Sequence, residues 1–468
     1  MTLSTNSWPS LPQIVVSHPS IQNIVSGISI AFSAGVFVSL NLLGAGGGHP
    51  ESAHVIQTTN AILSSVWFFS ACVGGTYLKM LGPAVTMCFG VCTYALYVGS
   101  LWYYEVSGQQ IFPLVGGAVV GIGAGAVFIT SGYIQVAYSD EKNKGKFIAI
   151  QNTLQATGST ICSILPVILN KDNMSRSGVP PAIYITYITS MLVVAMLALL
   201  TLRRPAQVKA AGVSSTAHHQ LQCDLLRELK ANLSVFKEWK LLLMLPAFLP
   251  AGSFLIYLGS VNAFQNSLRA RSLLSFVALV VQVPFGHLLH MILDKPDWTK
   301  RARSLAGVTF VGLPLCIAWV WEIARTRNID RTTPPSVPLD WADHEYGASM
   351  VLFTLNWTAS ILWQYIVPWF IGALDIPPEK LSHYMGVQRG FLAAGEAICF
   401  GVDAARISYV VFSGAIFAFY AAGIAVLFYI GAYELKEIDS HGLIATRRPP
   451  TDLEAEGSNQ VEKERTGI

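Results

Sequence analysis

The sequence predicts an all-α membrane protein with twelve transmembrane helices arranged as two pseudo-symmetric bundles of six. Of its 468 residues, 52% are hydrophobic and only 12% are charged, which is about half the charged share of a soluble protein. The charges are also clustered, so that residues 52–78, 80–104 and 106–139 contain no Asp, Glu, Lys or Arg. A helix needs about 20 apolar residues to cross the hydrocarbon core. Each of these runs can therefore hold one transmembrane helix.

Charge-free windows along the sequence predict all twelve spans and divide the chain into five parts. The longest hydrophilic stretch, 203–240, separates six spans from six, and the tail after Tyr433 is polar, charged and expected to be disordered. The predicted spans are 20–44, 53–78, 83–104, 111–137, 147–169, 181–202, 241–261, 271–293, 304–322, 347–373, 384–404 and 407–432. The predicted parts are an N-terminal cytosolic tail (1–19), a six-helix bundle (20–202), a cytosolic linker (203–240), a second six-helix bundle (241–432) and a cytosolic tail (433–468).

The basic residues predict the orientation. Placing both termini in the cytosol puts most of the 30 Lys and Arg residues on the cytosolic side, as the positive-inside rule requires. The sequon Asn173-Met-Ser175 then lies outside and is a candidate glycosylation site. In the linker, Leu225, Leu229 and Phe236 recur at helical spacing, which predicts either an amphipathic helix at the membrane surface or a solvated helix packed on the bundle. We expect a multipass protein of the plasma membrane rather than of an intracellular membrane.

One loop resembles a known superfamily. Gly75 to Gly82, after the second span, keeps the glycine spacing of the loop motif of the major facilitator superfamily, although Lys79 and Met80 stand where that motif has an acidic and then a basic residue. The resemblance implies the major facilitator fold, in which two bundles rock about a site near the middle of the membrane.

Several short patches resemble one branch of that superfamily, the fungal "uncoordinated"-type (UNC-ninety-three-like) membrane proteins. They are Asn41–Gly48, Leu81–Pro83, Ser100–Tyr103, Val261–Phe264, Trp363–Tyr365 and Gly386–Asp403. The chain departs from the branch at Gln151-Asn152, where an aromatic pair is expected, and at Glu396, where a small residue is expected. Animal members of this branch include a potassium-channel regulatory subunit and a trafficking escort for receptors. The resemblance therefore leaves both transport and regulation open.

The eleventh span is predicted to be the only one with charges in its interior. Arg389, Glu396 and Asp403 are spaced by seven residues, so they form one stripe on the helix, about 10.5 Å apart along its axis. Charged residues within a span nearly always face the protein interior or a wet space. We expect Asp403 near the outer surface, with Arg406 beside it. Our hypothesis is that Glu396 is a protonatable coupling group or an anchor for a cationic substrate; the alternative is a carboxyl that only fixes helix packing.

Uncharged polar residues in other spans are further candidates for substrate contacts. Gln151 and Gln155 lie four residues apart and share a helix face. Together these residues predict a polar but mainly uncharged cavity, suited to a neutral or amphipathic organic molecule. The alternative for each is an interhelical hydrogen bond, worth about 0.6 kcal/mol on average. The candidates are Gln151, Gln155, Asn41, Asn60, Gln364 and the aromatic Trp363.

The predicted function is secondary transport of a small organic molecule by alternating access, with proton coupling through Glu396. The alternative is a non-transporting regulatory or escort subunit for another membrane protein. We expect the lipid bilayer and a small organic substrate as partners, with a membrane-protein partner under the alternative. A net charge of +3 gives no reason to expect nucleic acid, and no catalytic, metal or cofactor motif is found. We therefore predict no enzyme, no metal and no cofactor.

Overall fold

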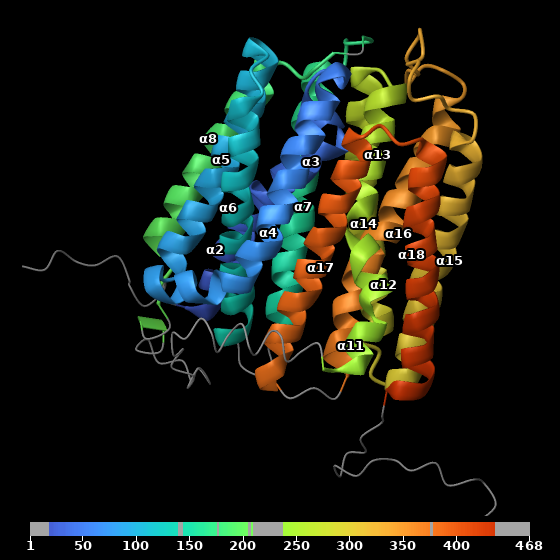
Figure 1. Ribbon diagram of the computed structural model, residues 1–468. Helices are drawn as coiled ribbons and strands as arrows, with labels where there is room; N and C mark the ends of the chain where they lie inside the picture. Colours follow the sequence, from blue (N-terminus) through green and yellow to red (C-terminus); the bar gives the residue numbers. More distant parts are fainter. Residues whose placement is uncertain are drawn as a thin grey trace, which may run out of the picture.

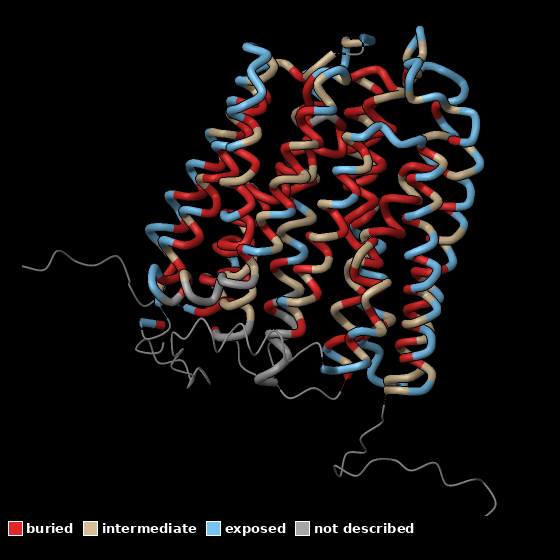
Figure 2. Tube along the Cα trace, in the orientation of Figure 1, coloured by how far each residue is buried: buried red, intermediate tan, exposed pale blue. Residues whose placement is uncertain are grey.

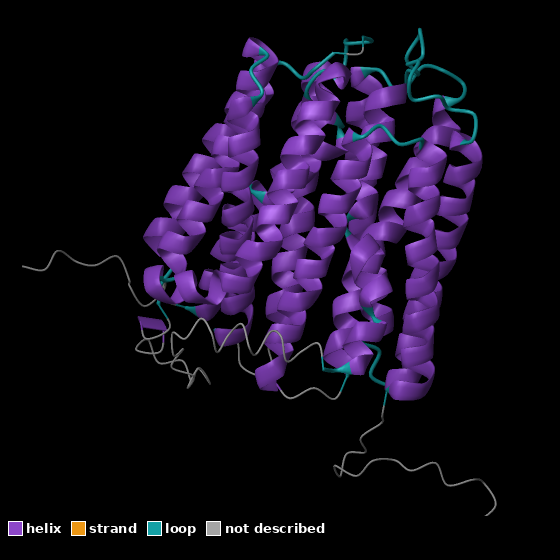
Figure 3. Cartoon of the chain, viewed as in Figure 1, coloured by secondary structure: helices purple, strands orange, loops and turns teal. Residues whose placement is uncertain are grey.

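The computed structural model describes residues 18–138, 144–175, 177–204, 207–208, 237–374 and 378–435. Helices dominate these ranges, and the loops that join them gather at the two ends of the bundle (Figure 3). The predicted all-α fold is confirmed. Most of the predicted linker, including its amphipathic helix, lies outside the described residues, as do nearly all of both predicted tails and the side chain of Lys79.

The first half of the chain forms six long helical segments, which we call the first half-bundle. The first segment is broken at Ser33 into two helices, and a glycine-rich turn with two short 3-10 helices (η1, Ala45–Gly47; η2, Pro50–Ser52) follows it. The helices are α2 (Pro19–Phe32), α3 (Ala34–Leu42), α4 (Ala53–Leu81), α5 (Pro83–Ser107), α6 (Ile111–Ala137), α7 (Lys144–Asn170) and α8 (Pro181–Thr201).

The second half-bundle has six segments as well, and it lies beside the first in Figure 1. Its first segment consists of α11 (Trp239–Leu243), α12 (Leu245–Phe248), η3 (Leu249–Ala251) and α13 (Ser253–Gln265). The others are α14 (Leu268–Leu293), α15 (Lys300–Thr326), α16 (Tyr346–Ala373), α17 (Pro378–Ala404) and α18 (Tyr409–Tyr429), the last continued by a π turn (Ile430–Glu434).

The helix ends follow local rules. Proline opens α5 and α8, where its missing N–H is not needed and its fixed φ suits a first turn. The Thr299 hydroxyl caps α15 by accepting from the N–H of Ala302 at 3.1 Å. This helix extends beyond the predicted span 304–322 at both ends. Charge-free windows had cut it short, because charged side chains remain helical where the helix leaves the hydrocarbon core.

Three long helices, α4, α7 and α17, lie where the half-bundles meet. Helix α4 packs against α17, and α7 packs against α14 (Figure 1). In the described part of the chain, nine other helical segments are long and apolar enough to cross a membrane by length and composition alone. Figure 2 shows the buried residues gathered inside the bundle and the exposed ones on its outer faces.

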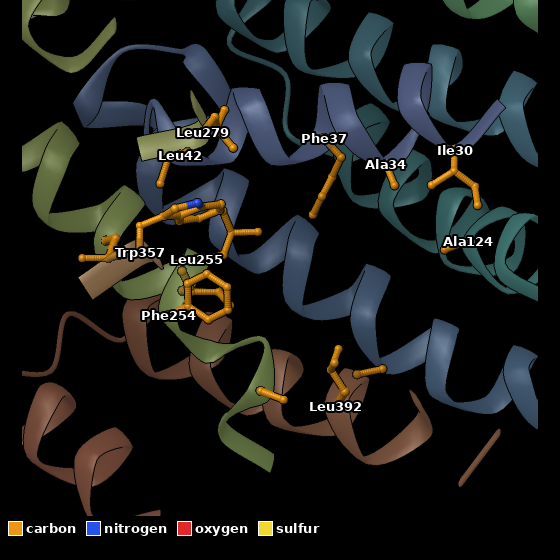
Figure 4. Close-up of a cluster of buried hydrophobic side chains, with 14 of the residues drawn as sticks. Ile30, Ala34, Phe37, Leu42, Ala124, Phe254, Leu255, Leu279, Trp357 and Leu392 are labelled. Atoms are coloured by element: carbon orange, nitrogen blue, oxygen red, sulfur yellow. The ribbon is translucent and has the colours of Figure 1, made fainter. Parts of the chain in front are cut away.

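One apolar cluster joins the two half-bundles. Leu42 of the first segment lies near Leu279, Trp357 and Phe254 of the second half (Figure 4). The Phe254 and Trp357 rings meet edge to face, with centroids 5.0 Å apart, a favoured geometry for aromatic pairs. The two halves therefore share a core in this conformation.

The seventh segment is broken near its middle. Pro246 and Pro250 have no N–H to donate, and Gly252 follows directly. A short 3-10 helix replaces α-helix at residues 249–251. Broken helices at membrane depth are tolerated where protein supplies partners for the freed backbone groups. The partners here come from α16 and α18.

Helix α17 lies unusually close to this break. A Cβ atom on Gly395 would lie 2.0 Å from the carbonyl oxygen of Leu249, which is closer than any real contact. Glycine at position 395 is therefore required by the approach of two backbones. This close approach fixes the position of α17 along the bundle, and with it the positions of the charged residues of that helix.

We expect Gly395→Ala to destabilise the protein, because the new methyl group meets backbone that cannot move aside. Such overpacking costs about 1–3 kcal/mol. The measurement is the thermal unfolding midpoint of the purified protein in detergent. Gly401→Ala on the same helix is the matched control, since a Cβ there has nothing within 4 Å, and it should be neutral or slightly stabilising. Equal midpoints for the two variants would contradict the packing described here.

Candidate functional site

Glu396 is buried at the contact between the half-bundles. Its side chain is 7% exposed, and its Oε2 atom accepts a weak hydrogen bond from the Ser64 hydroxyl of α4 at 3.4 Å. The other face of the carboxyl packs on the break in the seventh segment, where a Cβ on Gly252 would lie 2.2 Å from Oε1. The Tyr94 hydroxyl lies within electrostatic range. Among the described residues, Glu396 has no ion-pair partner.

Arg389 lies on the same helix, two turns nearer to the predicted cytosolic end. Its guanidinium is positioned over the ring of Phe128, 5.7 Å from the centroid, and Phe128 belongs to α6 of the first half-bundle. Arg389 and Glu396 form no ion pair with each other, as their separation along one helix implies. Among the described residues, the Arg389 guanidinium has no ion-pair partner on another helix either.

Asp403 has a partner that the sequence analysis did not identify. Arg331, from the loop before α16, approaches Oδ1 at 2.7 Å, and Gln57 of α4 donates to Oδ2 at 2.7 Å. Arg331 also lies over the Tyr409 ring, 4.2 Å from its centroid. Arg406, the expected neighbour, is exposed and donates only its backbone N–H, to the Asp403 carbonyl at 3.0 Å. The acidic group is thus paired across the interface by Gln57 and within its own half by Arg331.

Asn41 and Asn60 form a buried network with Tyr97 inside the first half-bundle. The Asn60 amide donates to Asn41 Oδ1 at 2.7 Å, and the Tyr97 hydroxyl donates to Asn60 Oδ1 at 2.5 Å. Asn41 in turn donates to the carbonyl of Phe37 at 2.9 Å. Their hydrogen-bonding capacity is largely used within one half, which favours a packing role for this pair.

Gln151 is engaged in a similar way, whereas Gln155 is not. Gln151 donates to Asn23 Oδ1 at 2.7 Å and accepts from Gln135 at 2.7 Å and from Ser131. These bonds join α2, α6 and α7. The side chain of Gln155 is partly exposed and has no hydrogen-bond partner among the described residues. The two glutamines therefore do not act as the pair that their spacing predicts.

Trp363 and Gln364 hydrogen-bond the break in the seventh segment. Trp363 Nε1 donates to the carbonyl of Ala247, and Gln364 Nε2 to the carbonyl of Ala251, each at 2.9 Å. The Tyr420 hydroxyl donates to the carbonyl of Pro250, also at 2.9 Å. An unpaired carbonyl in hydrocarbon costs several kcal/mol. These side chains therefore stabilise a non-helical segment that supports Glu396, and so they act on the site indirectly.

The expectation that only the eleventh span has interior charges is wrong. Arg271 of α14 is 0% exposed and Glu322 of α15 is 2% exposed. Two nitrogens of Arg325 bind the Glu322 carboxylate at 2.6 and 3.0 Å. The Tyr257 hydroxyl also donates to the Glu322 carboxylate, at 2.9 Å. Arg271 and Glu322 are the end residues of the predicted spans 271–293 and 304–322. Charge-free windows cannot distinguish a helix end buried in protein from one in water.

Arg271 joins the half-bundles at the predicted outer end. Its Nε donates to the carbonyl of Leu43 at 2.6 Å and its Nη2 to that of Gly44 at 3.0 Å. A cation at the C-terminal end of a helix is favoured by the helix dipole. Gly44 has a φ of +82°, and a Cβ there would lie 2.2 Å from the carbonyl oxygen of Gly259. One close contact between the half-bundles is thus formed by Leu43, Gly44, Gly259 and Arg271.

A loop outside the spans covers the same end. Arg269 forms an ion pair with Asp340 and lies over the Trp341 ring, 4.8 Å from its centroid. The hydrogen bond from Arg269 lowers the pKa of Asp340 from 3.8 to about 2. A carboxyl with a lowered pKa stabilises the fold above pH 3.8, and this contribution is lost as the pH falls through about 2. Asp340 is therefore unchanged in charge between pH 5 and pH 8.

Several site residues could not be found from the sequence. Ser64 and Phe128 are of types that abound in every span, and Gly252 is one of 39 glycines. Only the packing of α17 against α4 and the seventh segment brings them to Glu396 and Arg389. Pro250 and Gly252 disfavour helix and lie within a predicted span. They were the one sequence signal that could have indicated the break.

The chain is similar to known membrane proteins over most of its length. The family described as "Ion channel regulatory protein UNC-93" matches residues 54–304. An uncharacterised membrane protein of Schizosaccharomyces pombe is 32% identical over 409 residues, covering 86% of this chain and 82% of its own. The chain belongs to the UNC-93 family. UNC93-like protein 1 of Arabidopsis thaliana is 28% identical over 394 residues, covering 84% of this chain and 85% of its own.

The fold is that of a transporter superfamily. The xylose transporter XylE from E. coli, in a partially occluded inward-open conformation, superimposes with a TM-score of 0.58 at 13% sequence identity, covering 93% of this chain and 98% of its own. A structure of XylE is described as a major facilitator superfamily proton:xylose symporter. This UNC-93 family member thus has the predicted major facilitator fold, and hence a transporter-like architecture.

We expect Arg331→Gln to lower stability, because Asp403 would keep its buried charge and lose its cation. Removing one member of a buried ion pair costs about 3–5 kcal/mol. Arg406→Gln is the matched control and should change the free energy of unfolding by less than about 0.5 kcal/mol. The measurement is denaturant unfolding in detergent. A larger loss for Arg406→Gln than for Arg331→Gln would show that Asp403 is paired otherwise.

We also expect a glycan on Asn173 if its loop faces the lumen during synthesis. The Asn173 Oδ1 atom accepts from the Ser175 hydroxyl at 2.6 Å and from its N–H at 3.0 Å, so the two sequon side chains are already in contact. Expression in a eukaryotic host should give a band that glycosidase treatment shifts and that Asn173→Gln abolishes. A glycan on Asn232 instead would reverse the predicted orientation.

Proposed function

We propose that this protein is a proton-coupled secondary transporter that moves a small organic molecule by alternating access, with Glu396 as the coupling group. The observation that supports it is the position of Glu396. This buried carboxyl belongs to the second half-bundle, and its hydrogen-bond donor, Ser64, belongs to the first. A rocking motion of the two halves would change the surroundings of Glu396 more than those of any carboxyl paired within one half.

The chemistry of Glu396 suits such a role. Withdrawal from water favours the neutral form of a carboxyl, and a weak hydrogen bond at 3.4 Å does little to oppose this. Glu322 and Asp403 are different, because each has an arginine within 2.7 Å. Protonation and deprotonation of Glu396 can therefore accompany the change between closed and open arrangements without breaking an ion pair.

A second candidate function is regulation or escort of another membrane protein. The family description, "Ion channel regulatory protein UNC-93", favours it. Under this alternative the protein would act by binding its partner within the membrane, and Glu396 would only fix the packing of α17 on α4. The two candidates differ in whether a small molecule crosses the membrane.

The test compares small molecules in cells and medium for strains with the protein, without it, and with Glu396→Gln. We expect a metabolite to redistribute when the protein is deleted. The Gln variant should abolish concentrative transport and remove its dependence on pH, because an amide cannot exchange a proton. Glu105→Gln, a carboxylate at the end of α5 that accepts from the N–H of His49, is the control and should transport as the unmodified protein does.

Two results would contradict the proposal. If Glu396→Gln transports with an unchanged pH profile, Glu396 is not the coupling group. If no metabolite moves in any strain while one membrane protein copurifies in fixed ratio and is mislocalised on deletion, the regulatory function is the correct one. Asp340 does not complicate the pH profile, because its charge is constant between pH 5 and pH 8.

A further inference from the structure

The charged groups within the spans and at their ends differ in how they are satisfied. Arg325 is paired with Glu322, Arg331 with Asp403, and Arg269 with Asp340. Arg271 donates to carbonyl oxygens of the first half-bundle. Arg389 is different, since within the described residues it has neither an ion pair nor a hydrogen bond from its guanidinium. Its N–H donors are therefore available, while Glu396 of the same helix acts on its charge through space without forming an ion pair.

The surroundings of Arg389 are aromatic and come from both half-bundles. Phe128 lies under the guanidinium and is stacked on Trp67, with centroids 5.1 Å apart and planes 21° apart. Tyr365 of α16 is within electrostatic range. A Cβ on the next residue, Gly390, would lie 3.4 Å from the ring of Phe68. The cation thus lies over the Phe128 ring, with further aromatic side chains of both half-bundles nearby.

This arrangement leaves the cation only partly compensated. Arg389 is partly buried. Removing an ion fully from water costs several kcal/mol in a real protein, whereas a cation–π contact returns about 0.5–2 kcal/mol. A guanidinium presents a planar fork of N–H donors that matches a carboxylate in two parallel hydrogen bonds. An anion that enters between the half-bundles would complete the set of interactions that Arg389 lacks.

We propose that Arg389 binds the carboxylate of the transported substrate, and that the substrate is an aromatic or similarly flat organic acid whose ring packs against Phe128, Phe68 and Trp67. This inference rests on the proposed transport function and specifies its substrate class. It narrows the sequence-based expectation of a neutral or amphipathic molecule to an amphipathic acid, because Asn41, Asn60, Gln151 and Gln364 are hydrogen-bonded within the protein.

The position of Arg389 also explains why such a substrate would respond to movement. The guanidinium is fixed to α17 of the second half-bundle, and Phe128 and Trp67 belong to α6 and α4 of the first. A molecule held by both is bound across the interface. When the halves separate on one side, the substrate's ring would leave Phe128 and Trp67 while its carboxylate stays bound to Arg389. A site between rocking bundles requires such a loss of contacts.

The test measures binding to the purified full-length protein in lipid nanodiscs by calorimetry. The probes are 3-phenylpropanoate and indole-3-acetate, their uncharged amides, and hexanoate as a carboxylate without a ring. We expect the two aromatic acids to bind, their amides to bind about 10- to 100-fold more weakly, in line with the loss of a charged hydrogen bond, and hexanoate to bind more weakly than either aromatic acid.

Variants at position 389 decide the role of the guanidinium. Arg389→Gln should reduce binding of the aromatic acids to the level of the amides, and Arg389→Lys should give an intermediate affinity because it keeps the charge without the planar fork. Arg327→Gln, at an exposed position after α15, is the control and should bind as the unmodified protein does. If Arg389→Gln does not fold, the Lys variant still gives the comparison.

The proposal is wrong if none of the acids binds the unmodified protein, if acids and amides bind equally, or if the position 389 variants bind the acids as tightly as the unmodified protein. These failures differ from that of the proposed function. A metabolite that moves in the deletion experiment but is not a carboxylate would overturn the substrate class alone, whereas acid binding without any flux would overturn transport alone.

Discussion

The absence of water inside a bilayer is the constraint on which this structure depends. Every backbone group or charge that leaves a regular helix must find its partner within the protein. The break in the seventh segment meets this requirement with side chains from α16 and α18, namely Trp363, Gln364 and Tyr420. Arg271 meets it with backbone carbonyls at the end of the first segment. The tertiary contacts of both half-bundles follow from satisfying these few groups.

The same constraint distinguishes structural from functional polar residues. A buried group whose partners are complete needs no ligand, and most of the polar residues in the spans are of this kind. Among the described residues, the buried side-chain amides of Asn356 and Gln388 have no hydrogen-bond partner. Helix α17 also contains the incompletely satisfied charges, because Glu396 has one weak donor and Arg389 has only an aromatic ring. Both lie where the half-bundles meet, and both have neighbours from the opposite half. Incomplete satisfaction at a moving interface is the physical basis of the transport proposal.

The fold was predictable from the sequence to a greater extent than the site. Charge-free runs gave the spans, since hydrocarbon excludes charge regardless of tertiary structure. The charged stripe on the eleventh span was also correctly placed in the interior. The partners were not predictable: Arg331, which binds Asp403, comes from a loop more than 70 residues away, and no sequence signal indicates that Arg271 and Glu322, at the ends of their predicted spans, are buried. Pairing across helices depends on packing angles and depths, which no single helix records.

The close backbone contacts have a genetic consequence. Gly44, Gly259 and Gly395 each have a backbone carbonyl oxygen about 2 Å from where a Cβ would stand. Every single-base change that alters the amino acid of a glycine codon introduces a side chain or a stop. At these three codons no missense allele is conservative, so loss-of-function alleles should concentrate there although none of the three glycines has any chemistry of its own.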